Sequence, residues 1–96
     1  MRQQVTVHTS DAKRLKPLLK SALEREAKLL DHSIQRTRQA LVPYETRYDL
    51  TSNEFERKSK AREIEETPDY LDWWMEVEAL RHLEAQRASL KEAKLD

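Results

Sequence analysis

A hydrophobic repeat of about 3.5 residues, carried by residues 23–48, constrains the fold of this chain more than any other feature of its sequence. Its positions alternate by four and three residues over more than three heptads, which predicts one long helix with a coiled-coil seam. Leu19 extends the apolar stripe by one turn towards the N-terminus, and Leu18 and Leu29 broaden its flank. The seam consists of Leu23, Ala27, Leu30, Ile34, Thr37, Leu41, Tyr44 and Tyr48.

Two prolines bear on the limits of this long helix. Pro17 fits the first turn of a helix, because the N–H group that proline lacks would have no partner there, while Ser10 and Asp11 offer an alternative, earlier cap. Pro43 stands in the interior, where proline removes a hydrogen bond and collides with the carbonyl four residues earlier. Because the repeat stays in phase across Pro43, we predict a helix over residues 11–48 that is kinked near residue 43 and not broken.

The stretch LTSNEF marks the start of a second helix. Thr51 suits the N-cap and Glu54 follows three residues later, which is the pattern of a capping box. Leu50 and Phe55 occupy the positions of a hydrophobic staple. The apolar pattern then fades, so this helix is predicted to be short and to span residues 52–64.

A third helix start follows at Thr67, which we place at the N-cap with Pro68 at the first helical position. Asp69 and Asp72 would then lie near the positive end of the helix dipole. This helix is predicted over residues 68–94. It would be roughly 40 Å long, against roughly 45 Å for the first helix counted from Leu18 to Tyr48, by the rise per residue of an α-helix. Two long helices of matched length that are joined by a short one are typical of an antiparallel hairpin.

Composition supports an all-α fold and limits the size of its core. The chain has 96 residues, of which 38% are charged and 6% aromatic, and it has no glycine for tight turns, sheet bulges or phosphate-binding loops. A chain of this size buries a modest fraction of its surface, so we treat residues 1–96 as a single helical domain that needs help from a partner. A lone hairpin also leaves one side of each helix open. We therefore expect the antiparallel helical hairpin with its short middle helix to form a homodimer, a four-helix bundle.

The sequence also bears on where the protein works. It has no cysteine, which excludes disulfides and thiolate metal sites. No apolar run reaches the roughly 20 residues of a membrane span, and the polar start MRQQVTVHTS lacks the hydrophobic region of a signal peptide. We expect a cytoplasmic protein with no membrane partner. Residues 1–10 are interpreted as a tail; the alternation of Val5 and Val7 leaves a weak strand, added to a partner's sheet, as the alternative.

Catalysis and metal binding find little support in the sequence. Its histidines are isolated, and the spacing of Glu78 and His82 by one helical turn gives a surface ion pair more often than a metal site. No acid–base constellation stands out, and a hairpin offers little concave volume for a substrate. We predict that the protein is not an enzyme and has no catalytic residue, metal site or cofactor.

Charge is divided unevenly along the chain. Residues 1–48 hold ten Lys/Arg against five Asp/Glu, and residues 49–96 hold eight against thirteen, so two segments of opposite sign can attract each other within or between subunits. The basic residues are dispersed, so nucleic-acid binding is not expected. Between Glu63 and Glu78 there are seven acidic residues and no basic one. This run indicates either a solvated helix start or a surface that docks a cationic protein, such as a nucleic-acid-cleaving enzyme.

The adjacent residues Trp73 and Trp74 raise the question of what each indole touches. Neighbouring residues on a helix point about 100° apart, so only one of them can face the core. Trp73 shares a face with Val77 and Leu80 and is the predicted core residue, whereas either Phe55 or a second chain covers Trp74. The predicted partner-binding surface comprises Tyr70, Leu71, Asp72, Trp74, Met75, Glu76 and Glu78. The predicted core and dimer seam comprises Leu23, Leu30, Ile34, Leu41, Tyr44, Tyr48, Trp73, Val77 and Leu80.

The combination of RYDLTSNEF, an acidic connector and DYLDWWMEVEAL resembles a group of small, all-helical prokaryotic proteins. In that group, a long helix ends in a K/R-Y-x-hydrophobic-S/T-x-x-E-F box and is followed by an acidic stretch and an aromatic-acidic helix. The lack of glycine in the connector and the presence of Pro43 depart from this pattern. The matching residues are Arg47, Tyr48, Leu50, Thr51, Glu54 and Phe55 in the box, and Asp69, Tyr70, Asp72, Trp73 and Glu78 in the closing helix.

Members of that group are often encoded beside a small toxin and are regarded as antitoxins of type II toxin–antitoxin pairs. The resemblance therefore implies a cognate toxin-like protein as the partner. We predict a non-catalytic protein–protein interaction module, antitoxin-like, that neutralises a partner enzyme by direct binding. The alternative is a structural or scaffold helical-bundle dimer without a toxin partner.

Overall fold

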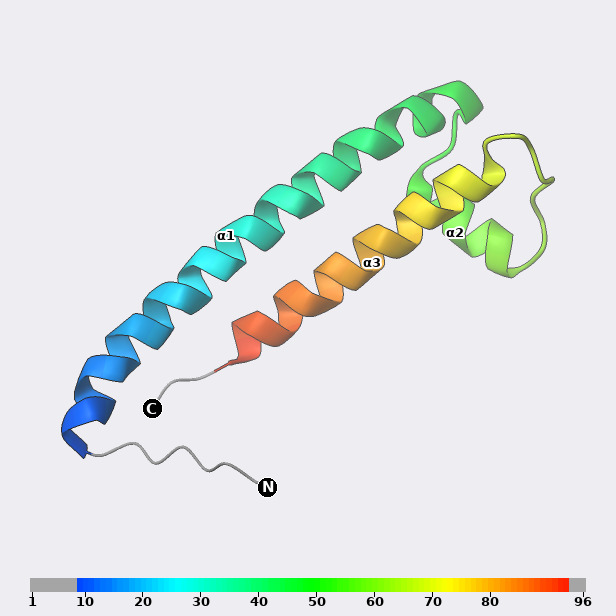
Figure 1. Cartoon of the computed structure of the whole chain (residues 1–96). Coiled ribbons are helices and arrows are strands. Elements are labelled where there is room, and N and C mark those ends of the chain that lie inside the picture. Colours follow the sequence, from blue (N-terminus) through cyan, green and yellow to red (C-terminus); the bar gives the residue numbers. More distant parts are fainter. Residues whose placement is uncertain (1–8, 94–96) are drawn as a thin grey trace, which may run out of the picture.

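The computed structural model describes residues 9–93, which contain three helices. These helices are α1 (Thr9–Tyr48), α2 (Ser52–Lys60) and α3 (Tyr70–Glu92). Figure 1 shows α1 and α3 side by side and running in opposite directions, with α2 beside the start of α3. The all-α hairpin with a short middle helix is therefore confirmed. Residues 1–8, which hold most of the predicted tail or strand, lie outside the described range.

α1 runs for 40 residues and includes both of its prolines. It starts at Thr9, two residues before the predicted start at residue 11. The alternative that placed Pro17 in the first turn is wrong, because Pro17 is the ninth helical residue. The helix crosses Pro43 without interruption (Figure 1). Packing explains this continuity, because Leu41 is buried and Tyr44 stacks on Trp73 of α3. The kink expected near Pro43 stays a prediction.

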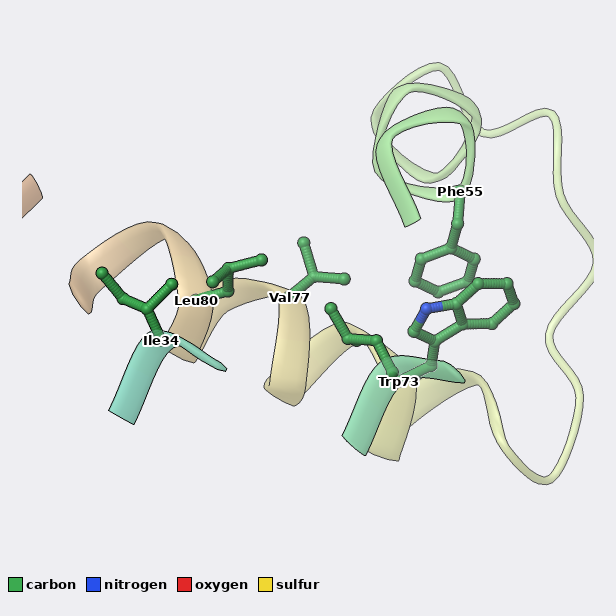
Figure 2. Close-up of a cluster of buried hydrophobic side chains, with 6 residues drawn as sticks. Ile34, Phe55, Trp73, Val77 and Leu80 are labelled. Atoms are coloured by element: carbon green, nitrogen blue, oxygen red, sulfur yellow. The ribbon is translucent and has the colours of Figure 1, made fainter. Parts of the chain in front are cut away.

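The seam residues line the contact between α1 and α3, and Figure 2 shows part of this core. Buried seam residues are Leu30, Ile34, Leu41, Trp73, Val77 and Leu80, and half-buried ones are Leu23, Tyr44 and Tyr48. Leu18 and Leu29 were expected to broaden the apolar flank, but they are 66% and 59% exposed. The reason is that α3 covers only one side of α1, and both leucines directly precede seam positions, about 100° round the helix.

α2 begins where its capping box predicts. Thr51 is the N-cap, and its side-chain oxygen accepts a hydrogen bond from the backbone N–H of Glu54 at 3.1 Å. The neighbouring free amide, that of Ser52, donates to the Glu45 carboxylate of α1 at 2.8 Å. The start of α2 is therefore satisfied both locally and by α1.

The ends of α1 and α2 are built without glycine. Asp49 follows α1 with a φ of 50°, and Arg62 follows the end of α2 with a φ of 56°. In both places the N–H of the next residue donates to a carbonyl five residues earlier, at 3.2 and 2.8 Å, which is the long bond of a Schellman motif. Because of this motif, α2 ends at Lys60, four residues before the predicted end at residue 64.

α3 begins at Tyr70, two residues later than predicted. Thr67 and Pro68 belong to the preceding turn, in which the N–H of Tyr70 donates to the carbonyl of Thr67 at 3.0 Å. Asp69 holds the N-cap position, but its side chain makes no capping hydrogen bond. The expected start at Thr67 and Pro68 is therefore wrong, because the carboxylate of Asp69 is bound to α1 as described below. The helix ends at Glu92, against the predicted residue 94.

The two long helices differ in length. α1 has 40 residues and α3 has 23, which correspond to about 60 and 35 Å, so the prediction of matched lengths is wrong. The first turns of α1 consequently extend beyond the end of α3 (Figure 1). In this region Leu15, Leu18 and Leu19 are 37%, 66% and 44% exposed. The hairpin therefore has an uncovered apolar end.

Candidate interaction surface

An aromatic stack joins all three helices at the start of α3. The indole of Trp73 lies parallel to the ring of Phe55 from α2, with ring centroids 3.9 Å apart, and Figure 2 shows this overlap. Tyr44 and Tyr48 of α1 also stack on Trp73, at centroid distances of 5.8 and 5.6 Å. The indole N–H donates to the hydroxyl of Ser52 at 3.0 Å. Trp73 is thus held by apolar contacts and by a hydrogen bond, which fixes the orientation of α3.

The second tryptophan has a different environment. Trp74 is half-buried and packs against the edge of the core cluster. Phe55, one of the two candidates to cover it, stacks on Trp73 instead, so that assignment is wrong. Tyr70 is also half-buried and lies edge-on to Phe55 at 5.5 Å. Two of the residues predicted for partner binding, Tyr70 and Trp74, therefore pack partly against their own chain.

Asp69 ties the start of α3 to the end of α1. The hydroxyl of Tyr48 donates to the Asp69 carboxylate at 2.8 Å, and the guanidinium of Arg47 forms an ion pair with the same oxygen. These hydrogen bonds, from Tyr48 first and Arg47 second, hold the pKa of the Asp69 carboxyl below its ordinary value. The sequence placed Asp69 near the positive end of the helix dipole, whereas in the structure its carboxylate links the start of α3 to the end of α1.

Asp69→Asn should lower the urea midpoint of unfolding at pH 7 and lose most of that effect in acid. Because the folded-state pKa is lowered, the contribution of Asp69 to stability is fully present above the carboxyl pKa of the unfolded chain, about 4, and is lost as the pH falls through the folded-state pKa. Urea titrations of both proteins at pH 7 and at pH about 2.5 test this.

Glu65→Gln is the control for this experiment, because Glu65 is exposed in the connector between α2 and α3 and takes part in none of the ion pairs among residues 13–93. It should shift the midpoint little at either pH. If the urea midpoints of the wild type and Asp69→Asn differed by the same amount at both pH values, the role assigned to the Asp69 carboxylate would be contradicted.

The exposed part of this region is apolar at its centre and acidic around it. Leu71 and Met75 are 64% and 60% exposed and, being four residues apart, lie on one side of α3. Asp72 and Glu78 are exposed beside them, and Glu76 is half-buried. We call these five residues of α3 the acidic face. The structure thus brings five of the seven predicted partner-binding residues together at or near the surface.

The negative charge of the acidic face is not neutralised by the described part of the chain. None of the ion pairs among residues 9–93 includes Asp72, Glu76 or Glu78. Their influence reaches Tyr44, whose pKa is raised first by burial and then by the charges of Asp72, Asp69 and Glu76. An apolar centre with unpaired carboxylates around it suits a cationic protein surface.

Arg81 is a residue that sequence reasoning missed. Its guanidinium donates to the carboxylates of Glu56 at 3.1 Å and Glu84 at 2.8 Å and to the side-chain oxygen of Asn53 at 2.6 Å. The hydrogen bonds to Glu56 and Glu84 raise the pKa of Arg81. Arg81 therefore links α3 to α2 through its hydrogen bonds to Asn53 and Glu56. No spacing in the sequence connects residues 53, 56 and 81, so only the fold reveals this role.

The described part of the chain also bears on metal binding and on membrane insertion. No cluster of three His, Asp or Glu side chains suited to a metal ion occurs within residues 9–93. His82 and Glu78 are both exposed. None of the helices in this range has the length and apolar character needed to cross a membrane. In comparisons with known proteins, no family model, curated protein or solved structure matches this chain.

Proposed function

We propose that this protein is a non-catalytic interaction module that binds a cationic partner protein through the acidic face, in the manner of an antitoxin that neutralises an enzyme. One observation carries the proposal: Leu71 and Met75 are more than half exposed in the middle of carboxylates that have no ion-pair partner in the described chain. Exposed apolar side chains with charges of one sign around them are typical of protein interfaces.

Two kinds of side chain contribute to the proposed binding, apolar anchors and carboxylates. Leu71 and Met75 would act as anchors that fill apolar pockets of the partner. Asp72, Glu76 and Glu78 would compete for the cations with which the partner binds its own substrate, as in an enzyme that cleaves nucleic acid. Because Trp73 fixes α3 from behind, little conformational freedom of the backbone is lost on binding.

Self-association is the second part of the proposal. Two hairpins that pack together through their long helices close a four-helix bundle, which covers apolar side chains that one hairpin leaves open. Leu18 and Leu29 on α1 support this, because both are more than half exposed. The same leucines favour the alternative function, a scaffold dimer that has no toxin partner.

The test of the binding function is co-expression with the product of the neighbouring gene, followed by co-purification at low salt. We expect a stable complex. Replacing both anchors, in the variant Leu71→Ala/Met75→Ala, should weaken it by about 30-fold or more, since truncating a binding anchor typically costs about 2 kcal/mol or more. The affinity is measured by titration calorimetry with the purified partner.

Val42→Ala is the matched control, because Val42 is 52% exposed but lies on α1 outside the acidic face. It should leave the affinity unchanged. Failure of the two wild-type proteins to associate at low salt would count against the antitoxin-like function and in favour of the scaffold. Equal affinities for the double variant and the wild type would show that binding uses another surface.

A further inference from the structure

Two patches of opposite charge lie at opposite ends of the hairpin. The first is the acidic face on α3. The second, which we call the basic end, is residues 13–20 of α1; it contains Lys13, Arg14, Lys16 and Lys20 and no acidic residue. None of these four cations takes part in an ion pair with another side chain of residues 13–93. Both patches are therefore charged and without a partner in the described chain.

The two patches cannot neutralise each other within one molecule. The acidic face lies beside Tyr44 and Tyr48, near the end of α1, because these tyrosines stack on Trp73. Lys20 lies 24 residues before Tyr44 along the same helix, which is about 36 Å away. The Debye length at physiological ionic strength is about 8 Å, so the attraction between the patches of one chain is screened.

Both patches also expose apolar side chains. At the basic end Leu18 is 66% exposed and Leu19 is 44% exposed, and on the acidic face Leu71 and Met75 are 64% and 60% exposed. Each patch thus offers the other an opposite charge together with an apolar surface. This combination favours association that is specific in orientation.

Part of each patch lies on the side of the hairpin that α2 leaves open: this holds for Leu18 and Asp72, whereas Lys20 and Glu78 follow the seam positions Leu19 and Val77 and lie on the side of α2. α2 lies on the side of the hairpin that holds the residues directly after seam positions. Val42 follows Leu41 and Arg81 follows Leu80, and both line one groove together with residues of α2. Leu18 and Asp72 instead precede seam positions, Leu19 and Trp73. On a helix, the residues before and after a seam position point about 200° apart. Because α1 and α3 are antiparallel and face each other, the residues before seam positions on both helices lie on the same side of the hairpin. Leu18 and Asp72 therefore lie on the side away from α2.

We propose that a second copy of this chain occupies the acidic face: two hairpins lie antiparallel, with the basic end of each packed on the acidic face of the other. A two-fold axis makes this contact twice in one dimer, which doubles the buried surface. The inference rests on the proposed binding function of the acidic face. It adds that the second copy masks this face until a partner protein displaces it.

The test uses the full chain and its mass in solution, measured by sedimentation equilibrium. We expect a dimer of twice the chain mass of 11.4 kDa in 50 mM salt, with a dissociation constant that rises by about tenfold or more in 500 mM salt. Arg14→Glu and Asp72→Arg should each weaken the dimer by about tenfold, because each places like charges across the interface. Combining the two changes in one chain should restore the dimer.

Arg57→Glu on α2 makes a matched change of charge outside both patches and should leave the mass unchanged; circular dichroism checks that every variant is folded. A chain that is monomeric at 100 μM in 50 mM salt would overturn the proposal. So would a dimer that is indifferent to Arg14→Glu and Asp72→Arg, or a monomer whose basic end binds phosphatidylglycerol vesicles instead.

Binding to the product of the neighbouring gene distinguishes a failure of this inference from a failure of the proposed function. The variant Arg14→Glu keeps the acidic face intact, so it should bind that protein at least as tightly as the wild type, since no second copy has to be displaced. A wild-type monomer that still binds the partner would overturn only the dimer. A dimer that responds to charge reversal but binds no partner would overturn only the antitoxin-like function.

Discussion

Trp73→Ala should destabilise the protein by about 3–5 kcal/mol, the usual cost of truncating a buried aromatic residue. The indole is 1% exposed and stacks on Phe55, Tyr44 and Tyr48, so its loss leaves a cavity where the three helices meet. It also deprives the buried hydroxyl of Ser52 of its donor. Because small domains are stable by only about 5–15 kcal/mol, this loss removes a large part of the total, and the variant should unfold at a much lower urea concentration in a titration followed by circular dichroism.

Two further variants separate the causes of this effect. Trp73→Phe keeps an aromatic ring in the stack but removes the indole N–H, so it should cost about 1–3 kcal/mol. Trp74→Ala changes the half-buried neighbour and should cost less than Trp73→Ala. All titrations need the same protein concentration, because dimer formation would couple stability to concentration. Equal losses for Trp73→Ala and Trp74→Ala would contradict the different roles assigned to the two tryptophans.

Pro43→Ala should stabilise the protein by about 2 kcal/mol. Proline in a helix interior is about 3 kcal/mol less favourable than alanine, and the greater freedom of the unfolded variant chain takes back about 0.4–1 kcal/mol of that gain. Pro43 is exposed and lies within the unbroken helix α1, so alanine would add a backbone hydrogen bond without disturbing the core. Urea or thermal unfolding measures the gain.

Val42→Ala is the neighbouring control, and it should change stability by no more than about 0.5 kcal/mol because Val42 is an exposed helix residue. A Pro43→Ala variant that is less stable than the wild type would contradict this prediction. It would mean that Tyr44 and Tyr48 reach Trp73 only because Pro43 bends α1, as the predicted kink requires.

Local patterns in the sequence identify the elements of this fold because their causes are local. The seam from Leu30 to Leu41 follows from periodicity, since residues at this spacing must share one side of a helix. Thr51 was found as the N-cap of α2 because a capping box lies within four residues. The presence and order of the helices were therefore predictable.

The features that sequence reasoning missed depend on contacts between distant residues. α3 starts at Tyr70 and not at Pro68, and its N-cap residue, Asp69, binds Arg47 and Tyr48, which lie about twenty residues earlier. Phe55 stacks on Trp73 and not on Trp74 because the path of α2 decides which indole it meets. The overhang of α1 was missed because the helix lengths were compared from Leu18, directly after Pro17, a frequent first-turn residue that lies well inside the helix.

The candidate surface was predictable in its composition but not in its exposure. The sequence identified an acidic, apolar segment around the tryptophan pair, and Trp74 was one of the predicted partner-binding residues, covered by either Phe55 or a second chain. In the structure Trp74 is half-buried, and Leu71 and Met75 are the most exposed large apolar residues of α3. Helical spacing separates the faces of α3, but how far each face is covered depends on where α1 and α2 pack.

The adjacent tryptophans also make the chain its own optical reporter. Indole emission depends on the polarity around the ring, and the two rings differ in this respect: Trp73 is enclosed by other aromatic side chains, whereas Trp74 is open to water on one side. In a Trp74→Phe protein, emission would follow the integrity of the interior, and in a Trp73→Phe protein it would follow events at the neighbouring surface. Unfolding and docking would thus be recorded separately, without any attached dye.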